Sequence, residues 1–423
     1  MRRIILVLAL AVAALPFLLG GSSAVAGAGN GVLAVDPGPH QRGVAHHPLY
    51  LKVFGQDQKG RPIITNTTPK GYTPDHVRTA YGFSSLTATG SGQVIGIVDA
   101  YDAPKIASDL QTFITTFGLQ SMYGLPGTSA CSVSTGPHPC FQKVYAQSKP
   151  RTNSGWALET SLDVEWAHAI APGADILLVE ARTASLSNLL GAVNVAVNGG
   201  AHAVSMSWGA GDFSSEALYD SYFNKSGVTF TAASGDNGSG TIWPSTSPYV
   251  VGVGGTTLNI GSGGNYVSET AWSGSGGGIS PYESEPGYQS SYPIPSTGGK
   301  RGAPDVAYDA DPSTGFPVYD STPYQGQNGW FQVGGTSAGA PQWAALIALA
   351  DEGRSPALSS NNLTSSPVYN AAGSAVYSTN YHDITSGTNG GCGSVCTAGS
   401  GWDFVTGLGS PQADNLVPYL AGH

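Results

Sequence analysis

Short apolar runs alternate with longer amphipathic stretches over most of this chain. The apolar runs that have the length and residue types of buried strands are 93–100, 176–180, 202–206, 228–233 and 249–252. The stretches of helical periodicity between them are 105–117, 186–197 and 214–224. Strands separated by helices indicate βαβ units. We therefore predict an α/β domain of three layers, with a mostly parallel central sheet and helices on both faces.

Two further helices are predicted beside the candidate chemistry. Residues 156–170 form one continuous helical pattern, and residues 340–352 are helical and apolar on nearly all sides, so this second helix should be buried. A shorter helix should begin at Thr73-Pro74, where Thr serves as the cap and Pro takes the first helical position. Residues 261–299 and 380–411 show little regular pattern and are predicted as loops.

The N-terminus has the pattern of a secretory signal peptide. Two arginines precede an apolar run at 4–19, and A-x-A cleavage patterns follow at 24–28. The alternative is a membrane anchor, but the run is shorter than the roughly 20 residues that span a bilayer, and Pro16 interrupts it. We predict a signal peptide at 1–26 and a secreted, extracellular protein without stable membrane association.

The remaining chain divides into a leader and one folded domain. Residues 27–70 are rich in Pro, Gly and His, with one apolar stretch at 49–54, and we interpret them as a short irregular leader or a remnant pro-segment. The folded domain extends from 71 to 423 and is expected to be a monomer.

Charged residues are scarce in this composition. Asp, Glu, Lys and Arg make up 10% of the chain, against roughly 25% in an average soluble protein. The formal net charge is −10, with no basic stripe for phosphates, so a nucleic-acid partner is not expected. Because few carboxylates are available to take up protons, acid creates little positive self-repulsion. This composition favours a protein that works in acidic surroundings.

Four cysteines fall into two close pairs. Cys131 lies near Cys140, and Cys392 lies near Cys396, with Gly, Ser or Pro around each pair. Neither pair has histidines at the spacing of a zinc site, so metal ligation is the weaker alternative. In an oxidising compartment each pair is predicted to form a short-range disulfide that holds a surface loop.

A serine at the start of the predicted buried helix is the candidate nucleophile. Residues 334–341 are GGTSAGAP, and Ser337 follows two glycines and a strand-like stretch at 330–333. Free backbone N–H groups and the positive end of the helix dipole stabilise an alkoxide or oxyanion at such a position. The alternative is a Gly-rich turn with a helix cap, which occurs in many α/β proteins.

The candidate base is a pair of carboxylates. Glu159 and Asp163 are four residues apart in the predicted helix 156–170, so they share one helix face. Tryptophans at 156 and 166 make the surroundings apolar, and one or both carboxylates should be half-buried, which favours a shared proton and one raised pKa. Such a pair can act as a general base for serine in acid. The alternative is a solvated acidic face.

Asp236 is the third candidate. It follows the predicted strand 228–233, at the sheet edge where ligands bind in doubly wound folds. An ionised aspartate would repel an oxyanion, whereas a protonated one donates a hydrogen bond to it. We interpret Asp236 as an oxyanion-binding acid, and a simple Gly-Asp-Asn-Gly turn is the alternative.

Together these segments resemble the sedolisin family of serine-carboxyl peptidases, which share a subtilisin-like fold. The resemblance covers about 73–420, and its motifs are ExxxD at 159–163, AIAPGA at 169–174, SGD at 234–236 and GTSA at 335–338. It implies that Ser337 is the nucleophile, that Glu159 is its base and that Asp163 orients this base. It also implies that Asp236 binds the oxyanion.

The resemblance further implies a substrate groove. Ser207-Trp208-Gly209 resembles the strand that lines this groove in the family, whose Trp joins the hydrogen-bond network behind the acid residues. In two respects the chain departs from the family. Residues 27–70 are too few for the long N-terminal prodomain that members usually carry, and Asn237 stands where Ser is more common.

A site for one Ca²⁺ is implied near the C-terminus. The matching residues are the carboxylates of Asp383 and Asp403 and the backbone carbonyls of Ile384, Gly399 and Gly401. Calcium takes roughly 6–8 oxygen ligands, which suits such a set. A Cys392–Cys396 disulfide would close the loop between its two halves.

The expected function is that of a secreted, acid-acting endopeptidase that cleaves polypeptides through an acyl-enzyme on Ser337. One rival is a neutral subtilisin-like protease that uses Asp99, His168 and Ser337, and it predicts loss of activity in acid as the histidine becomes protonated. Another rival is a secreted binding protein without catalytic activity on the same scaffold.

Overall fold

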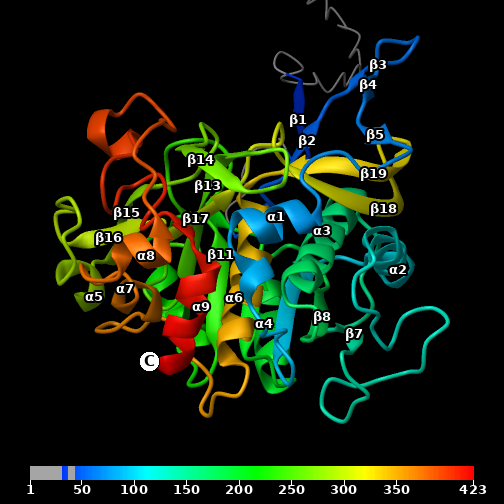
Figure 1. Cartoon of the computed structure of the whole chain (residues 1–423), viewed down its shortest axis with the longest axis horizontal. Coiled ribbons are helices and arrows are strands. Elements are labelled where there is room, and N and C mark those ends of the chain that lie inside the picture. The colour runs from blue at the N-terminus through cyan, green and yellow to red at the C-terminus, as the bar shows by residue number, and fades with distance from the viewer. Residues whose placement is uncertain (1–30, 37–42) are drawn as a thin grey trace, which may run out of the picture.

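The computed structural model describes residues 31–36 and 43–423, so the predicted signal peptide at 1–26 lies outside the described residues (Figure 1). Within the described ranges, none of the helices is both long and apolar enough to cross a bilayer.

A large, mostly parallel sheet forms the centre of the molecule. Its strands are β6 (Val94–Ala100), β7 (Phe141–Tyr145), β8 (Asp175–Ala181), β9 (Ala203–Met206), β11 (Thr229–Ala233), β13 (Val251–Ile260), β14 (Tyr266–Ala271) and β17 (Val306–Asp309). The order is β14-β13-β11-β9-β6-β8-β7, and β17 pairs with β13. Only β14 runs antiparallel to its neighbour. The strands predicted from the apolar runs are therefore confirmed.

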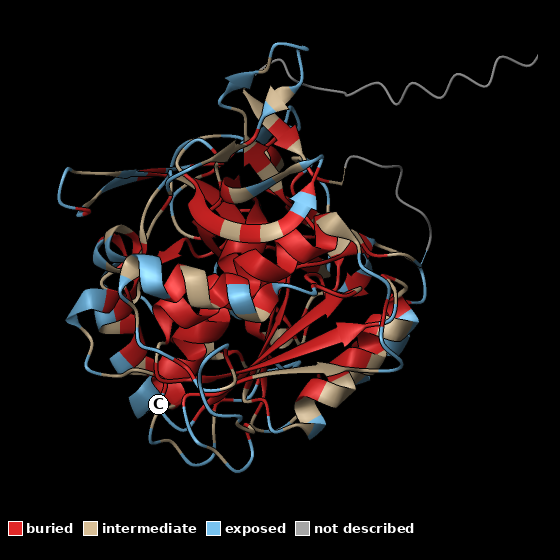
Figure 2. Ribbon diagram, turned by 90° about the vertical axis from the view of Figure 1, so that its right-hand side faces the viewer, coloured by how far each residue is buried: buried red, intermediate tan, exposed pale blue. Residues whose placement is uncertain are grey.

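Helices cover both faces of this sheet. The first face carries α3 (Ser154–Ile170) and α6 (Gly339–Asp351), with α2 (Ile106–Phe117) packed outside α3, and the second face carries α4 (Leu186–Asn198). A hydrophobic core lies on each face of the sheet, and the side chains of β6 point alternately into one core and the other. Ile95 and Ile97 pack on the α3–α6 side, and Val94 and Val98 pack on the α4 side. Burial on both faces explains why these strands are continuous apolar runs (Figure 2). The predicted three-layer architecture is confirmed.

The predicted buried helix is confirmed as α6, in which every residue is buried. The predicted helix start at Thr73 is also present, because the Thr73 hydroxyl accepts a hydrogen bond from the His76 amide at the head of α1 (Pro74–Ala80).

A second, separate sheet includes part of the predicted leader. It contains β1 (Val32–Ala34), β2 (Tyr50–Lys52), β5 (Thr65–Asn66), β18 (Phe316–Tyr324) and β19 (Gln327–Gly334). Both β2 and β5 pair antiparallel with β19, the strand that leads into the Ser337 turn. Residues of the leader are thus joined by backbone hydrogen bonds to the folded domain.

Two segments differ from the sequence-based prediction. Residues 261–299, predicted as loops, contain β14, β15 (Gly278–Ser284) and the short helix α5 (Gly287–Ser290). Pairing of β14 with β13 supplies the backbone partners that this Gly- and Ser-rich sequence did not reveal. Residues 214–224, predicted as a helix, form only a 3₁₀ segment, η3 (Glu216–Tyr222).

The smaller elements complete the chain. They are η2 (Phe83–Ser85), β3 (Gly55–Gln56), β4 (Pro62–Ile63), β10 (Ala210–Gly211), β12 (Ile242–Trp243), β16 (Lys300–Ala303), η4 (Thr336–Ala338), α7 (Pro367–Asn370), α8 (Tyr377–Asn380), β20 (Tyr381–His382), η5 (Gly393–Cys396), β21 (Ser410–Pro411) and α9 (Ala413–Gly422).

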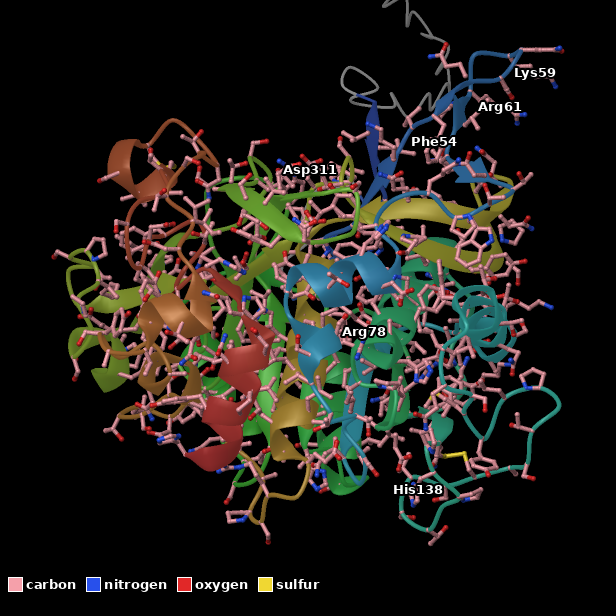
Figure 3. All side chains as sticks on the ribbon, in the orientation of Figure 1. Phe54, Lys59, Arg61, Arg78, His138 and Asp311 are labelled. Carbon is pink, nitrogen blue, oxygen red and sulfur yellow. A yellow bond between two sulfur atoms is a disulfide. The ribbon has the colours of Figure 1, made fainter. Side chains whose placement is uncertain are left out.

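Both predicted disulfides are formed. The Cα atoms of Cys131 and Cys140 are 5.8 Å apart, and those of Cys392 and Cys396 are 5.2 Å apart. The first disulfide holds the loop that precedes β7, near His138 (Figure 3). The prediction of two short-range disulfides is confirmed.

Candidate active site

The four predicted catalytic residues meet at the carboxyl edge of the central sheet. Asp236 follows β11, Ser207 follows β9, and Asp99 is the penultimate residue of β6. Glu159 and Asp163 enter from the middle of α3, and Ser337 lies in η4 just before α6. Because carboxyl ends of parallel strands lie at one edge, this topology gathers side chains that are far apart in the sequence.

The turn around Ser337 is tightly constrained. Gly335 has a φ of 117°, in the region that favours glycine. A side chain there would collide with the Asp236 carboxylate and with the carbonyl of Pro48. Ser337 is fully buried, and its Oγ makes no hydrogen bond within the described residues. The Ser337 hydroxyl is close enough to Glu159 to lower the pKa of that carboxyl, against the larger effects that raise it.

The carboxylate pair is more deeply buried than its sequence suggests. Glu159 and Asp163 are both fully buried, where half-burial of one or both was expected. Burial, and then the charges of Asp163 and Asp99, raises the pKa of Glu159 well above its usual range. Burial and the charge of Asp99 do the same for the pKa of Asp163. The Ser207 hydroxyl donates to Asp163 Oδ1 at 2.8 Å and orients it.

Asp99 is the third member of this carboxyl cluster. It is fully buried, and burial raises its pKa to about 7, although a hydrogen bond involving Thr160 lowers it. Sequence reasoning considered Asp99 only for a histidine triad. The position of Asp99 at the end of a buried strand was the only local signal that it belongs to the carboxyl cluster. Three carboxyls in one buried site retain protons at pH values at which isolated carboxyls have already lost theirs.

The two carboxylate oxygens of Asp236 have different hydrogen-bond surroundings. Its Oδ1 accepts hydrogen bonds from the Thr336 amide at 2.7 Å and from the Thr336 hydroxyl at 2.8 Å. Its Oδ2 has no hydrogen-bond partner in the described chain and lies against Gly335. Burial raises the pKa of Asp236 to about 7, although the two Thr336 hydrogen bonds lower it. In acid the carboxyl is protonated, and Oδ2 is the oxygen able to donate.

A histidine from the leader also contacts the site. His47 Nδ1 lies 3.2 Å from Glu159 Oε2, and its ring packs edge-on against Trp156 at 4.8 Å between centroids. Burial lowers the pKa of His47 to about 4. Sequence reasoning missed this residue because its only local signal was a His-His-Pro triplet in an apparently irregular leader.

His168, by contrast, does not approach the nucleophile through any hydrogen bond that the structure describes. Its Nε2 lies 2.7 Å from the carbonyl oxygen of Gln120, and burial lowers its pKa to about 4. This arrangement argues against the histidine triad Asp99/His168/Ser337.

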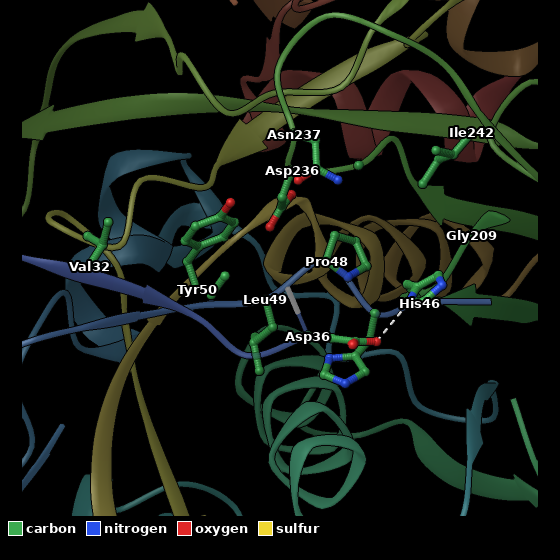
Figure 4. A pocket seen from close by; sticks show the side chains of 13 residues that line it. Val32, Asp36, His46, Pro48, Leu49, Tyr50, Gly209, Asp236, Asn237 and Ile242 are labelled. Carbon is green, nitrogen blue, oxygen red and sulfur yellow. Dashed lines mark hydrogen bonds and ion pairs between the residues drawn. The ribbon is translucent and has the colours of Figure 1, made fainter. Parts of the chain in front are cut away.

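The predicted groove residues have separate partners. Trp208 is fully buried, and its indole N–H donates to the Val98 carbonyl at 2.8 Å rather than to a carboxylate. Gly209 exchanges backbone hydrogen bonds with His46, at 2.8 and 2.9 Å. A pocket of about 290 Å³ is lined by Gly209, by Asp236 and by Pro48 of the leader (Figure 4).

A hydrogen bond joins the two segments that carry the predicted calcium residues, 383–384 and 399–403. Asp383 accepts from the Gly401 amide at 3.0 Å, and Asp403 accepts from the Gly399 amide at 3.1 Å. No lysine or arginine forms an ion pair with either aspartate in the described ranges. Carboxylates beside a glycine-rich segment, without an ion-paired lysine or arginine, are ligands of the type that a hard divalent cation takes.

Comparison with known proteins agrees with this architecture. A model of the subtilase family matches residues 151–407. Kumamolisin from Bacillus sp. (strain MN-32) is 32% identical over 88% of this chain and 71% of its own length. Sedolisin from Pseudomonas sp. (strain 101) is 29% identical over 88% of this chain, which spans 65% of that relative's length.

A solved structure supports the same assignment. Pseudomonas sedolisin, described as a serine-carboxyl proteinase in complex with pseudo-iodotyrostatin, superposes with a TM-score of 0.67 at 29% identity. The match covers 84% of this chain and 99% of the solved one. The chain therefore belongs to the subtilase family and, within it, to the sedolisin group of serine-carboxyl peptidases.

Proposed function

We propose that this protein is a secreted endopeptidase that hydrolyses peptide bonds of polypeptides in acid, with Ser337 as nucleophile. The observation that carries this proposal is the buried cluster of Glu159, Asp163 and Asp99, with the Ser337 hydroxyl close enough to Glu159 to affect the pKa of that carboxyl. Such a cluster can hold and transfer protons at low pH, where a histidine base is already protonated.

The proton follows a short route in this mechanism. As Ser337 Oγ attacks the scissile carbonyl carbon, its proton passes to Glu159. Asp163, held by Ser207, lowers the free energy of this transfer by sharing the proton with Glu159. Glu159 then returns a proton to the leaving amine, and water hydrolyses the acyl-enzyme by the reverse sequence.

Asp236 stabilises the oxyanion. With Oδ1 occupied by Thr336, a protonated Oδ2 points to the side of Gly335 where a substrate carbonyl would lie. A neutral acid that donates a hydrogen bond to the developing charge contributes several kcal/mol in sites of this kind, roughly 10²–10³ in rate. The Ser337 backbone N–H is the second donor.

One calcium ion is proposed to hold the C-terminal loops. Asp383 and Asp403 would supply carboxylate oxygens, and Ile384, Gly399 and Gly401 would supply backbone carbonyls. When bound, the ion supplies charge neutralisation and cross-links the loop, with no part in the peptide-bond chemistry.

The experiment that tests the function is hydrolysis of denatured casein at pH 4 and pH 8. We expect activity at pH 4 and loss at pH 8, and Ser337→Ala should reduce turnover by about 10⁴-fold or more. Ser108→Ala, at an exposed helical serine, is the matched control. Activity at pH 8 alone would favour a histidine-based enzyme, and no hydrolysis at either pH would favour a binding protein.

A further inference from the structure

We propose that a group of basic residues beside the active site gives this enzyme a preference for polypeptides with acidic side chains within about four residues of the scissile bond, on one side of it. The group consists of Lys105, Lys143, Lys149, Arg151 and Arg182, and we call it the basic rim. The inference rests on the proposed function and names the class of substrate that the same site prefers.

The basic rim gathers at the carboxyl ends of three neighbouring strands. Lys105 follows β6, and Arg182 directly follows β8. Lys143 lies in β7, and Lys149 and Arg151 follow that strand. These strands are adjacent in the sheet, in the order β6-β8-β7. The whole chain has only 17 lysines and arginines and a formal net charge of −10, so five cations in one region reverse the charge locally.

Backbone hydrogen bonds hold the two arginines on either side of one aromatic residue. The Tyr101 amide donates to the carbonyl of Ala181, the residue before Arg182, at 2.8 Å. The Asp102 amide donates to the Arg151 carbonyl at 3.0 Å. The segments that carry both arginines therefore meet at Tyr101 and its neighbour.

Tyr101 connects the basic rim to the catalytic base. Its φ of 66° lies in the left-handed region, which is rare for a bulky residue and is concentrated at functional sites. The Arg151 guanidinium lies over the Tyr101 ring at 5.6 Å, and that ring lies 6.2 Å from the Trp156 ring. The Arg151 charge is thus at most about 12 Å from Trp156, a length that about four residues of an extended chain span. Trp156 precedes Glu159 by three residues in α3.

The basic rim also borders the predicted substrate groove. The groove residues Ser207–Gly209 follow β9, and β9 pairs with β6. The Trp208 indole donates to the Val98 carbonyl of β6 at 2.8 Å, which joins the groove to the strand that leads into Tyr101. A polypeptide in this groove therefore passes beside the basic rim.

Buried acids neutralise only part of this charge. Asp102 pairs with Lys143 at 2.7 Å and with Lys149 at 3.6 Å, and Glu180 pairs with Lys143 at 2.9 Å. Burial raises the pKa of Glu180 to about 7, although Lys143 lowers it. In acid Glu180 is therefore protonated, and Asp102 alone faces two lysines.

The other three cations are available to a substrate. Lys105, Arg151 and Arg182 are exposed, and none of them forms an ion pair in the described ranges. The charge of Lys105 acts on Asp109 in the first turn of α2, whereas the two arginines have no acidic neighbour of this kind. Arginine keeps its charge at every working pH and binds carboxylates through two parallel hydrogen bonds. Glutamate side chains of an unfolded polypeptide are largely ionised at pH 5, since their pKa is about 4.3.

The first test is a cleavage-site profile of the full-length protein at pH 5. Peptides from a whole-cell digest serve as the substrate library, and mass spectrometry identifies the bonds that are cut. We expect Asp and Glu to be enriched at one or more of the four positions on one side of the cut bonds. Their depletion or random occurrence on both sides would overturn the inference.

The second test measures the preference with two matched peptides. They differ only in Glu or Gln at the most enriched position. We expect kcat/KM to be at least about threefold higher for the Glu peptide at low ionic strength. This ratio should approach one in about 0.5 M NaCl, which screens exposed charges, and at pH 3, where the glutamate is neutral. A ratio that salt does not change would overturn an electrostatic origin.

Variants assign the preference to the basic rim. Arg151→Gln and Arg182→Gln should each lower the Glu-to-Gln ratio, and the double variant should bring it close to one. A general loss of activity cancels, because the ratio compares two peptides on the same protein. Lys225→Gln is the control, since Lys225 lies in the turn that enters β11, at the opposite edge of the sheet, and it should keep the ratio of the wild type.

The outcomes separate this inference from the proposed function. Peptide hydrolysis with a ratio near one in the wild type, or with a ratio that the arginine variants leave unchanged, would overturn the inference and leave the proposed function standing. A wild type that hydrolyses neither casein nor any peptide of the library would overturn both.

Discussion

Asp236 Oδ1 accepts two hydrogen bonds from Thr336, one from its amide at 2.7 Å and one from its hydroxyl at 2.8 Å. These two donors alone would favour an ionised carboxylate. Burial outweighs them and raises the pKa of Asp236 to about 7. The carboxyl is therefore neutral in acid, with Oδ2 as the oxygen able to carry its proton.

This arrangement predicts the alkaline limb of the pH profile. Activity requires a protonated Asp236, so kcat/KM should fall as pH rises through about 7, the pKa of this group. Protonation of the Glu159–Asp163 pair as a coupled unit should set the acid limb, so the profile should be bell-shaped. Asp236→Asn keeps a neutral donor, so it should retain measurable activity and lose less of it toward pH 7. An alkaline limb that does not move in this variant would show that Asp236 has another role.

The Ser207–Asp163 hydrogen bond predicts a positioning effect. Ser207→Ala removes the donor to Asp163, so kcat/KM should fall by roughly 10- to 100-fold, as expected for a hydrogen bond to a charged group. The acid limb should shift to higher pH, because that hydrogen bond lowers the pKa of Asp163. Ser205→Ala is the matched control, since Ser205 lies two residues earlier on β9, is buried like Ser207, and has a hydroxyl without a hydrogen-bond partner in the described chain. Equal losses in both variants would indicate a packing effect alone.

The proposed calcium site predicts a stability effect in the C-terminal loops. A chelator on the wild type, or Asp403→Asn, should lower the melting temperature by several degrees, because an ion that binds only the folded state stabilises it. Asp414→Asn, at an exposed position of α9, is the control. Calorimetric titration with Ca²⁺ should show weaker binding in Asp403→Asn only. Unchanged melting in chelator and variant would exclude the site.

Buried carboxyls remote from Ser337 predict that the fold is more stable in acid than at neutral pH. Burial, and then neighbouring carboxylates, raises the pKa of Glu216 and of Glu283 to about 8 each. In the unfolded chain a glutamate loses its proton near pH 4.3. Between these values the folded state holds protons that the unfolded state has released, so the free energy of unfolding falls as pH rises from about 4 to 8.

Glu283→Gln tests this effect, because the amide keeps the shape and removes the titration. Its melting temperature should fall less between pH 5 and pH 8 than that of the wild type, measured by calorimetry in matched buffers. Glu285→Gln, at a partly exposed neighbour, should behave like the wild type. A drop in Glu283→Gln as large as in the wild type would contradict this assignment.

The elements of this protein follow closely from its sequence. The continuous apolar run at 94–100 predicts a strand covered on both faces, and β6 supplies residues to both cores. The spacing of Glu159 and Asp163 places them on one face of α3, and the glycines before Ser337 predict the turn into α6. Each of these features depends on periodicity, capping or backbone freedom within a few residues, so local sequence is enough to reveal it.

The contacts that define the site required the tertiary structure. Thr336 lies 100 residues from Asp236, and Ser207 lies 44 residues from Asp163, so no local pattern indicates either hydrogen bond. The sequence of the leader predicts an irregular segment, because its Pro- and His-rich residues have no periodicity of their own. Its strands β2 and β5 pair with β19, and its His46 pairs with Gly209, which brings the neighbouring His47 to Glu159. The sequence by itself therefore determined which elements form and which residue types carry the chemistry, whereas packing of distant segments decided which polar groups meet and how deeply they are buried.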